Sequence, residues 1–252
     1  MEIINEIRSK LQEKANPILA GNYKRYLKSP FEFYGLRVPK LREIAKQYKN
    51  LQLSEIYSLF NKLWQSKNHE EKSIAIFLLS LKEKQFDYET WKFTLPKIKD
   101  IKTWDHCDGI SSWVLGKMLS KNITLKRDIE NFVESKNPWE RRAAIISTSQ
   151  LIKEKKLELT FKLAEKLVYD EDVYVQKGAG WMLREAGKRE RLATRDFILR
   201  HLDMKAYAFS YATETSEMKF LRVLRKQKFS DKMKELRKIK KQKERAKEEK
   251  IN

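Results

Sequence analysis

The sequence contains few of the residues that make turns. Its 252 residues include only seven glycines and five prolines, well below the roughly 7% and 5% of ordinary proteins. β-Sandwiches and α/β sheets need many tight turns, and tight turns use both residue types heavily. A chain this poor in them is expected to have few turns and long helices.

Other residue types are scarce as well. The single cysteine, Cys107, excludes an internal disulfide and fits a reducing cytoplasm. Together with only three histidines, it forms no persuasive zinc site, so we expect neither a metal nor an organic cofactor. The longest apolar stretch, residues 73–81, is far too short to span a bilayer, and the charged N-terminus does not resemble a signal peptide. We therefore expect a monomeric cytoplasmic protein without membrane association, nucleoid-associated if the organism is prokaryotic.

Basic residues outnumber acidic residues in this sequence. The chain carries 55 Lys and Arg against 35 Asp and Glu, a formal net charge of +20. Such an excess is typical of proteins that bind a polyanion, although a solvated lysine-rich surface is the simpler alternative. Residues 225–252 hold a net +8 of this charge, which leaves +12 for residues 1–224. We predict one folded domain over residues 1–224 and a Lys/Arg-rich C-terminal helix or disordered tail over residues 225–252.

Apolar residues recur at helix spacing along most of the chain. Residues 3–11 open with such a stripe, and no segment favours a strand. The strongest helix start combines Asn137 as N-cap with Pro138 in the first turn and Glu140 placed for a capping box. Ser54 is expected to cap an earlier helix.

The helices also repeat. Four similar segments place Lys72, Asp108, Arg142 and Gln176 in one register, with steps of 36, 34 and 34 residues. A second amphipathic segment lies between each pair. Repeated helix–turn–helix units of this length predict an all-α, HEAT-like α-solenoid of antiparallel helix pairs. We expect one helix of each pair to line a concave basic face that binds the DNA backbone.

One group of side chains is not needed to build a solenoid and therefore suggests a function. Trp104 and Asp108 are four residues apart, so they share a helix face. Arg142 follows in the same register, and Trp181 comes 39 residues after it. Two indoles, a carboxylate and a guanidinium suit a cationic alkylated purine: indoles attract cations, the carboxylate stabilises an oxocarbenium-like sugar, and the arginine can hold a phosphate.

Plain structural explanations exist for the same residues. Asp105 and Asp108 near a helix start also complement the helix dipole, and Arg141 and Arg142 are compatible with ordinary surface charges. Most tryptophans at helical spacing serve packing. The following are assigned to the core: Trp64, Trp91, Trp113 and Trp139.

Four stretches together resemble a known family. They are WDHCD at residues 104–108, PWERRAAI around Arg142, VQKGAGWMLREAGK around Trp181, and RYLKSPFEFYGLRVPKLREIAK at residues 25–46. In this order, over residues 20–190, they resemble the AlkD-type glycosylases of the DNA alkylation repair family. The resemblance implies a HEAT-like solenoid that removes N3- and N7-alkylated purines from double-stranded DNA, leaves an abasic site, and needs no tight base pocket.

The resemblance also assigns residue roles. Asp108 matches the catalytic carboxylate, and Trp104 and Trp181 match the tryptophans that flank the lesion. Arg142 matches the DNA-contacting arginine of the family, and Tyr26 falls less closely where the family has an aromatic residue near the DNA. Apart from the resemblance, we expect Arg141 and Lys177 to contact DNA as well.

Two departures and two rival interpretations remain. Thr103 stands where some relatives have a second tryptophan, and residues 207–220 and the tail match the family poorly. The favoured interpretation is a monofunctional glycosylase, because no lysine stands out as a Schiff-base nucleophile. The main rival is a non-catalytic HEAT-like module that binds nucleic acid, and retention of Asp108 with both tryptophans argues against it. A protein-interaction scaffold is disfavoured by the basic body.

Overall fold

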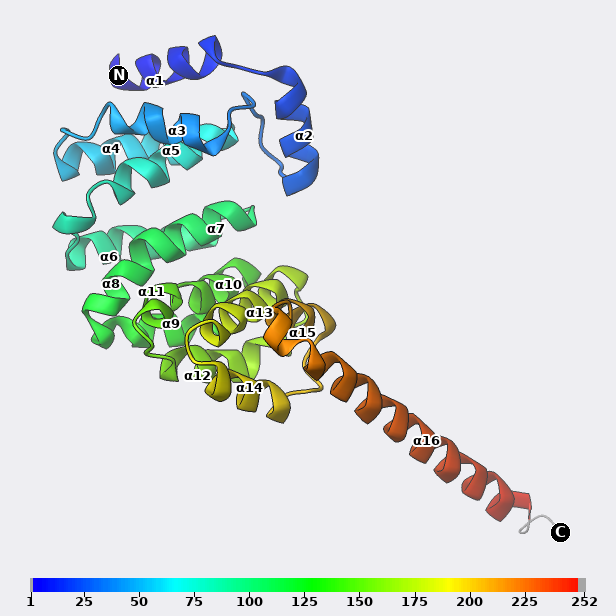
Figure 1. The fold of residues 1–252 in the computed structure, drawn as a ribbon. Helices are drawn as coiled ribbons and strands as arrows, with labels where there is room; N and C mark the ends of the chain where they lie inside the picture. The colour runs from blue at the N-terminus through cyan, green and yellow to red at the C-terminus, as the bar shows by residue number, and fades with distance from the viewer. Residues whose placement is uncertain (1, 249–252) are drawn as a thin grey trace.

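The computed structural model describes residues 2–248, and almost all of its regular structure is helical (Figure 1). Across these residues no strand forms, apart from an isolated bridge between Glu32 and Asn68. The helices are α1 (Glu2–Glu13), α2 (Pro17–Leu27), α3 (Val38–Lys46), α4 (Leu53–Trp64), α5 (His69–Ser80), α6 (Tyr88–Thr94), α7 (Trp104–Ile110), α8 (Gly116–Lys121), α9 (Lys126–Phe132), α10 (Pro138–Ile146), α11 (Ser149–Lys153), α12 (Glu158–Leu167), α13 (Val173–Gly187), α14 (Arg191–Arg200), α15 (Ala206–Ala212) and α16 (Phe220–Glu248).

The helices stack in chain order from α1 at one end to α14 at the other (Figure 1). One apolar core runs through the stack, and helices of neighbouring repeats contact one another, as α10 does α7 and α13. The predicted all-α, HEAT-like architecture is confirmed. Trp64 and Trp91 are buried in the core, while Trp113 and Trp139 are partly buried and pack against it.

The start of α10 follows the sequence signal only in part. Asn137 is the N-cap, and its Oδ1 accepts a hydrogen bond from the Trp139 backbone N–H at 3.0 Å, with Pro138 in the first turn. The predicted capping box is wrong, because Glu140 accepts instead from the hydroxyl of Ser135. The helix start is nevertheless where the sequence puts it.

The N-cap of α4 differs from the prediction. Gln52, not Ser54, occupies this position, and the Gln52 backbone N–H donates to Glu55 Oε2 at 2.6 Å. Ser54 lies inside the first turn of the helix. The helix therefore starts earlier than a serine cap would allow.

The loop between α2 and α3 is held by a buried carboxylate. Glu70 accepts hydrogen bonds from the backbone N–H groups of Tyr34, Gly35 and Leu36 at 3.1, 2.7 and 3.2 Å. Gly35 has a φ of +88° and lies against the backbone of Asn16, where no side chain fits. This loop positions α2 beside α7.

Helix α7 continues into α8 through a π-helical turn at Ser111–Leu115. Turns of this kind are rare and often occur at functional sites. This one directly follows the segment that carries Trp104 and Asp108.

Helix α16 begins at Phe220, five residues before the predicted domain boundary, and extends away from the stack (Figure 1). Arg225 fixes its start, because the guanidinium donates to Met204 O at 2.9 Å and lies over the ring of Phe209. Within residues 2–248, every helix is too short or too polar to span a bilayer.

Candidate active site

Five helices of the stack border a groove of about 680 Å³. It contains six of the seven predicted site residues: Tyr26, Trp104, Asp108, Arg142, Lys177 and Trp181. They come from α2, α7, α10 and α13. Residues up to 155 positions apart therefore line one surface.

Asp108 and Arg142 form a two-point ion pair in this groove. Arg142 Nε donates to Asp108 Oδ1 at 2.9 Å, and Nη2 donates to Oδ2 at 2.8 Å. Arg142 Nη1 donates to the backbone carbonyl of Tyr174. The Asp108 and Arg142 side chains are only 14% and 6% exposed. Arg142 thus fixes the orientation of the carboxylate and connects α7, α10 and α13.

The ion pair lies where water is largely excluded. Burial raises the pKa of the Asp108 carboxyl above its usual range, and the adjacent Arg142 guanidinium opposes that rise. Burial lowers the pKa of Arg142, but the Asp108 carboxylate outweighs it, so the net pKa lies above the ordinary value. Arg142 therefore remains a cation and favours the ionised form of Asp108.

Aromatic rings line the same groove as this carboxylate. Tyr26 packs edge-to-face on Trp104, with ring centroids 6.0 Å apart and an interplanar angle of 85°. Tyr26 is 72% exposed, which leaves its ring accessible to a ligand. Trp181 lines the same groove from α13. A planar cation in the groove would meet π-faces on more than one side.

Two glycines of α13 explain the GAG motif before Trp181. A Cβ on Gly178 would lie 3.1 Å from Arg142 Nη1, so glycine leaves room for the guanidinium. A Cβ on Gly180 would lie 2.3 Å from Ala208 O, so glycine lets α15 approach α13 closely. The motif thus builds the groove wall and makes space for the ion pair.

Cationic side chains surround the groove. Lys177 Nζ lies 5.0 Å from the ring centroid of Tyr207. Arg184 pairs with Glu214. Lys28, which ends α2 in a left-handed conformation, also borders the groove. These charges lie where a polyanion entering the groove would meet them.

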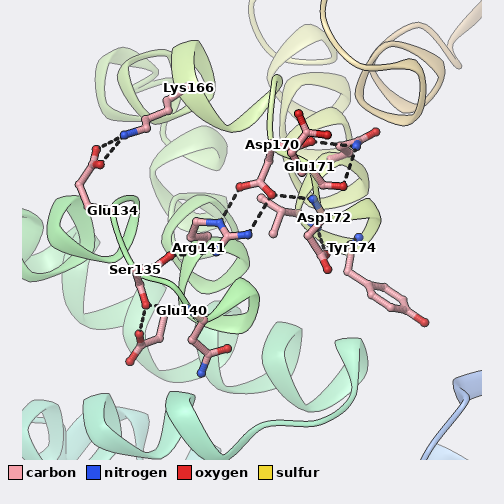
Figure 2. A network of polar contacts seen from close by, with 12 residues as sticks. Glu134, Ser135, Glu140, Arg141, Lys166, Asp170, Glu171, Asp172 and Tyr174 are labelled. Carbon is pink, nitrogen blue, oxygen red and sulfur yellow. Dashed lines mark hydrogen bonds and ion pairs between the residues drawn. The ribbon is translucent and has the colours of Figure 1, made fainter.

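Arg141 does not line the groove, although it precedes Arg142 directly. Its Nε and Nη2 donate to Asp170 at 2.6 and 3.0 Å, and Nη1 donates to Ser135 O at 2.8 Å (Figure 2). The side chain is 17% exposed. It connects the loops before α10 and α13, so its predicted role in DNA contact gains no support from its position.

Thr103 is buried rather than groove-facing. It is the N-cap residue of α7, and its hydroxyl lies 3.1 Å from His106 Nδ1. The position at which some relatives have a second tryptophan therefore belongs to the packing behind the site. Because Thr103 does not line the groove, having threonine at this position takes no contact away from the groove.

Six groove residues were not predicted from the sequence. They are Lys28, Val173, Tyr174, Arg184, Tyr207 and Tyr211. Arg184 lies one turn beyond Trp181 and two turns beyond Lys177 on α13, so it was detectable from helix spacing. The tyrosines of α15 lie in the stretch 207–220, to which no role was carried over from the sequence resemblance, and nothing in their spacing distinguished them.

Two of the three histidines lie close together and beside an aspartate, a grouping that was not recognised in the sequence. His69, Asp105 and His106 offer ligand atoms that all lie within 4.8 Å of one another. Burial is the main cause that lowers the pKa of each imidazole to about 3. Both are neutral at pH 7. Among the described residues, the ring nitrogens of His69 have no hydrogen-bond partner, whereas those of His106 contact the hydroxyls of Thr103 and Ser73 and the carbonyl of His69.

The family described as DNA alkylation repair enzyme matches residues 7–215. The chain belongs to this family. A protein from Enterococcus faecalis, described as a predicted DNA alkylation repair enzyme, has a similar structure: TM-score 0.70, 20% identity, 80% of this chain and 96% of that chain. The crystal structure of AlkD2 from Streptococcus mutans is similar at TM-score 0.54 and 18% identity, over 77% of this chain and 95% of that chain. Comparison with curated proteins finds no match.

Proposed function

We propose that this DNA alkylation repair protein is a monofunctional glycosylase. It hydrolyses the N-glycosidic bond of N3- and N7-alkylated purines in duplex DNA and leaves an abasic site. The observation that carries the proposal is the buried Asp108 carboxylate, held by Arg142 in a groove that Trp104 and Trp181 also line.

The chemistry follows from the charge of the substrate. In an alkylated purine the ring is cationic, so the bond between C1′ and the base nitrogen breaks with its electron pair going to the base. The sugar then develops oxocarbenium character, which a nearby carboxylate stabilises. Water adds to C1′ and releases one proton. Asp108 suits this role because its surroundings exclude most water, while the adjacent Arg142 guanidinium favours its ionised form.

The remaining groove residues bind rather than react. The faces of Trp104 and Trp181 attract a cationic base, at about 0.5–2 kcal/mol for each contact. Lys177, Arg184 and Lys28 are placed to meet phosphates, which position the duplex without reading its sequence. The basic body, with Tyr26 at the groove edge, supports a DNA-binding concave face.

Arg142 has a more limited part in DNA contact than the sequence suggested. Its Nε, Nη1 and Nη2 already donate to Asp108 and Tyr174 O. Its position supports the role of a positioning residue that orients the carboxylate. Any phosphate contact would have to use the remaining N–H groups of a side chain that is 6% exposed.

No cofactor takes part in this reaction scheme. The two groove lysines, Lys28 and Lys177, are proposed to serve phosphates and not to attack the sugar. Borohydride should therefore trap no covalent adduct between the protein and an abasic duplex. A trapped adduct that disappears in Lys177→Gln would replace the monofunctional assignment by a glycosylase with strand-cleaving activity.

The deciding experiment is incubation of the full chain with methylated duplex DNA, followed by chromatography of the released bases. We expect release of 3-methyladenine and 7-methylguanine above a control without enzyme, since these adducts also depurinate spontaneously. If release equals the control while the duplex still binds, the protein is a non-catalytic nucleic-acid-binding module, which is the second candidate.

A further inference from the structure

A second cavity lies behind the wall formed by Tyr26 and Trp104. Its volume is about 300 Å³ and its lining is mostly apolar, with Phe33, His69 and Asp105 among its residues. Tyr26 and Trp104 line both this cavity and the groove. The mechanism proposed above does not use His69, Asp105 or the buried His106 that lies close to both.

Those polar groups form a compact set of metal-ligand types. His69 opens α5, and Asp105 and His106 lie in the first turn of α7. The imidazole centroids are 4.0 Å apart, and the ligand atoms of all three residues lie within 4.8 Å of one another. Zinc accepts this combination of His nitrogen and Asp oxygen, at about 2.0–2.2 Å from the metal.

Several of these atoms lack a partner. Among residues 2–248, both ring nitrogens of His69 and Oδ1 of Asp105 are buried without a hydrogen bond. His69 is only 3% exposed. Its Nε2 lies 2.9 Å from Asp105 Oδ2, yet the contact lacks hydrogen-bond geometry. Buried polar groups are nearly always satisfied, so a lone pair and a carboxylate this close point to a missing cation.

His106 is oriented for the same task. Its Nδ1 lies 3.1 Å from the Thr103 hydroxyl, whereas its Nε2 contacts the Ser73 hydroxyl at 3.0 Å and His69 O at 3.2 Å, two contacts that a metal bound at Nε2 would replace. A fixed partner on the far ring nitrogen is the usual arrangement of a metal-binding histidine.

We propose that His69, Asp105 and His106 bind one divalent transition metal ion, Zn²⁺ in the first place, with a fourth position open to the cavity. Mg²⁺ and Ca²⁺ are disfavoured because they prefer all-oxygen ligand sets. The ion would join α5 to the first turn of α7 and so fix Trp104, which directly precedes Asp105. It would have a structural role and would not touch the reacting atoms, so the inference is independent of the proposed reaction.

The test uses the full-length chain without an affinity tag, stripped with chelator and titrated with Zn²⁺ against a chromophoric competitor. We expect one zinc per chain. His69→Gln and Asp105→Asn should each weaken binding by at least about 10-fold, the smaller loss seen for outer-shell partners. His201→Gln, a change in the histidine outside the cluster, and Cys107→Ala, which removes a nearby thiol, should leave affinity unchanged.

Two further measurements separate loss of binding from loss of fold. Far-UV circular dichroism of each metal-free variant checks the helices, and Zn²⁺ should raise the melting temperature of the wild type but not of His69→Gln. Co²⁺ in place of Zn²⁺ should give visible d–d bands. Folded wild type without bound zinc or a thermal shift would overturn the proposal, as would unchanged affinity in folded His69→Gln and Asp105→Asn.

Discussion

Asp108 and Arg142, 34 residues apart, share two hydrogen bonds of 2.8 and 2.9 Å in a site from which most water is excluded. The pair has a role in the proposed reaction and a structural role. It sets the orientation of the proposed catalytic carboxylate, and through Tyr174 O it also joins three helices of successive repeats.

Replacing Arg142 by alanine should destabilise the protein strongly. The change leaves the Asp108 carboxylate buried without its cation, which costs about 3–5 kcal/mol in comparable buried pairs. Urea denaturation measures the loss. Arg184→Ala is the matched control, because its partner Glu214 is 58% exposed and exposed pairs contribute about 1 kcal/mol or less. Equal stability losses in the two variants would contradict the structural role of Arg142.

Asp108→Asn should separate binding from chemistry. The side chain keeps its shape and loses its charge, so affinity for duplex DNA should persist or rise slightly. Release of 3-methyladenine and 7-methylguanine should fall by about 10²–10³, the usual effect of losing one group that stabilises transition-state charge. Glu185→Gln, a change on α13 outside the groove lining, serves as control. Wild-type release rates in Asp108→Asn would remove this residue from the mechanism.

The two glycine positions Gly180 and Gly21 should respond to alanine in opposite ways. In Gly180→Ala the new Cβ would lie 2.3 Å from Ala208 O, which forces α15 away from α13 and should lower stability and widen the groove. In Gly21→Ala the nearest atom is the end of the Arg25 side chain at 3.8 Å. Alanine is the better helix former by up to about 1 kcal/mol. Thermal melts of both variants provide the comparison.

Duplex affinity should fall steeply with salt, with a log–log slope of about −0.9 for each phosphate neutralised. Removal of the tail should weaken binding without abolishing it. Because Arg225 anchors the start of α16 on Phe209, the truncation should begin at residue 226. It then removes a net +7 and leaves +13 on the body. Complete loss of duplex binding would show that the groove is not the principal contact.

The buried imidazoles should resist protonation. With pKa values lowered to about 3 by burial, His69 and His106 should show constant ring proton shifts in NMR spectra of metal-free protein from pH 8 to pH 5. In the unfolded chain each has an ordinary pKa near 6.5 and binds a proton over this range. Their burial therefore stabilises the fold above pH 6.5, and this contribution is lost as pH falls, by about 2 kcal/mol for each ring at pH 5. Titration of either ring near pH 6 would contradict the burial.

The repeat made part of this site predictable. Asp108 and Arg142 were grouped because residues one repeat apart recur on the same face of successive helices, and the structure places them in contact. The repeat did not show which of the two adjacent arginines would face the groove. Arg141 and Arg142 differ by about 100° around the helix axis, so Arg141 faces the loop before α13 and Arg142 faces the groove. Only the register of α10 against its neighbours decides which.

Other features depend on information that spacing does not contain. His69 and His106 are 37 residues apart, a full repeat, but His69 precedes the aligned segment and was never compared with its counterpart. Tyr207 and Tyr211 lie on α15, beyond the last recognisable repeat, and reach the groove only because Gly180 allows close packing. Ser54 looked like a cap, but the chain had already entered the helix at Leu53.

The groove takes its lining from helices α2 to α15, and no single loop closes it. Its width is therefore a property of the curvature of the stack, because small rotations between successive repeats add along a solenoid. A core substitution far from Asp108 that tilts one layer relative to the next would change the separation of Tyr26 and Tyr211 without altering either residue. The fit between the groove and its ligand therefore depends on packing throughout the hydrophobic core, and not on the groove residues alone.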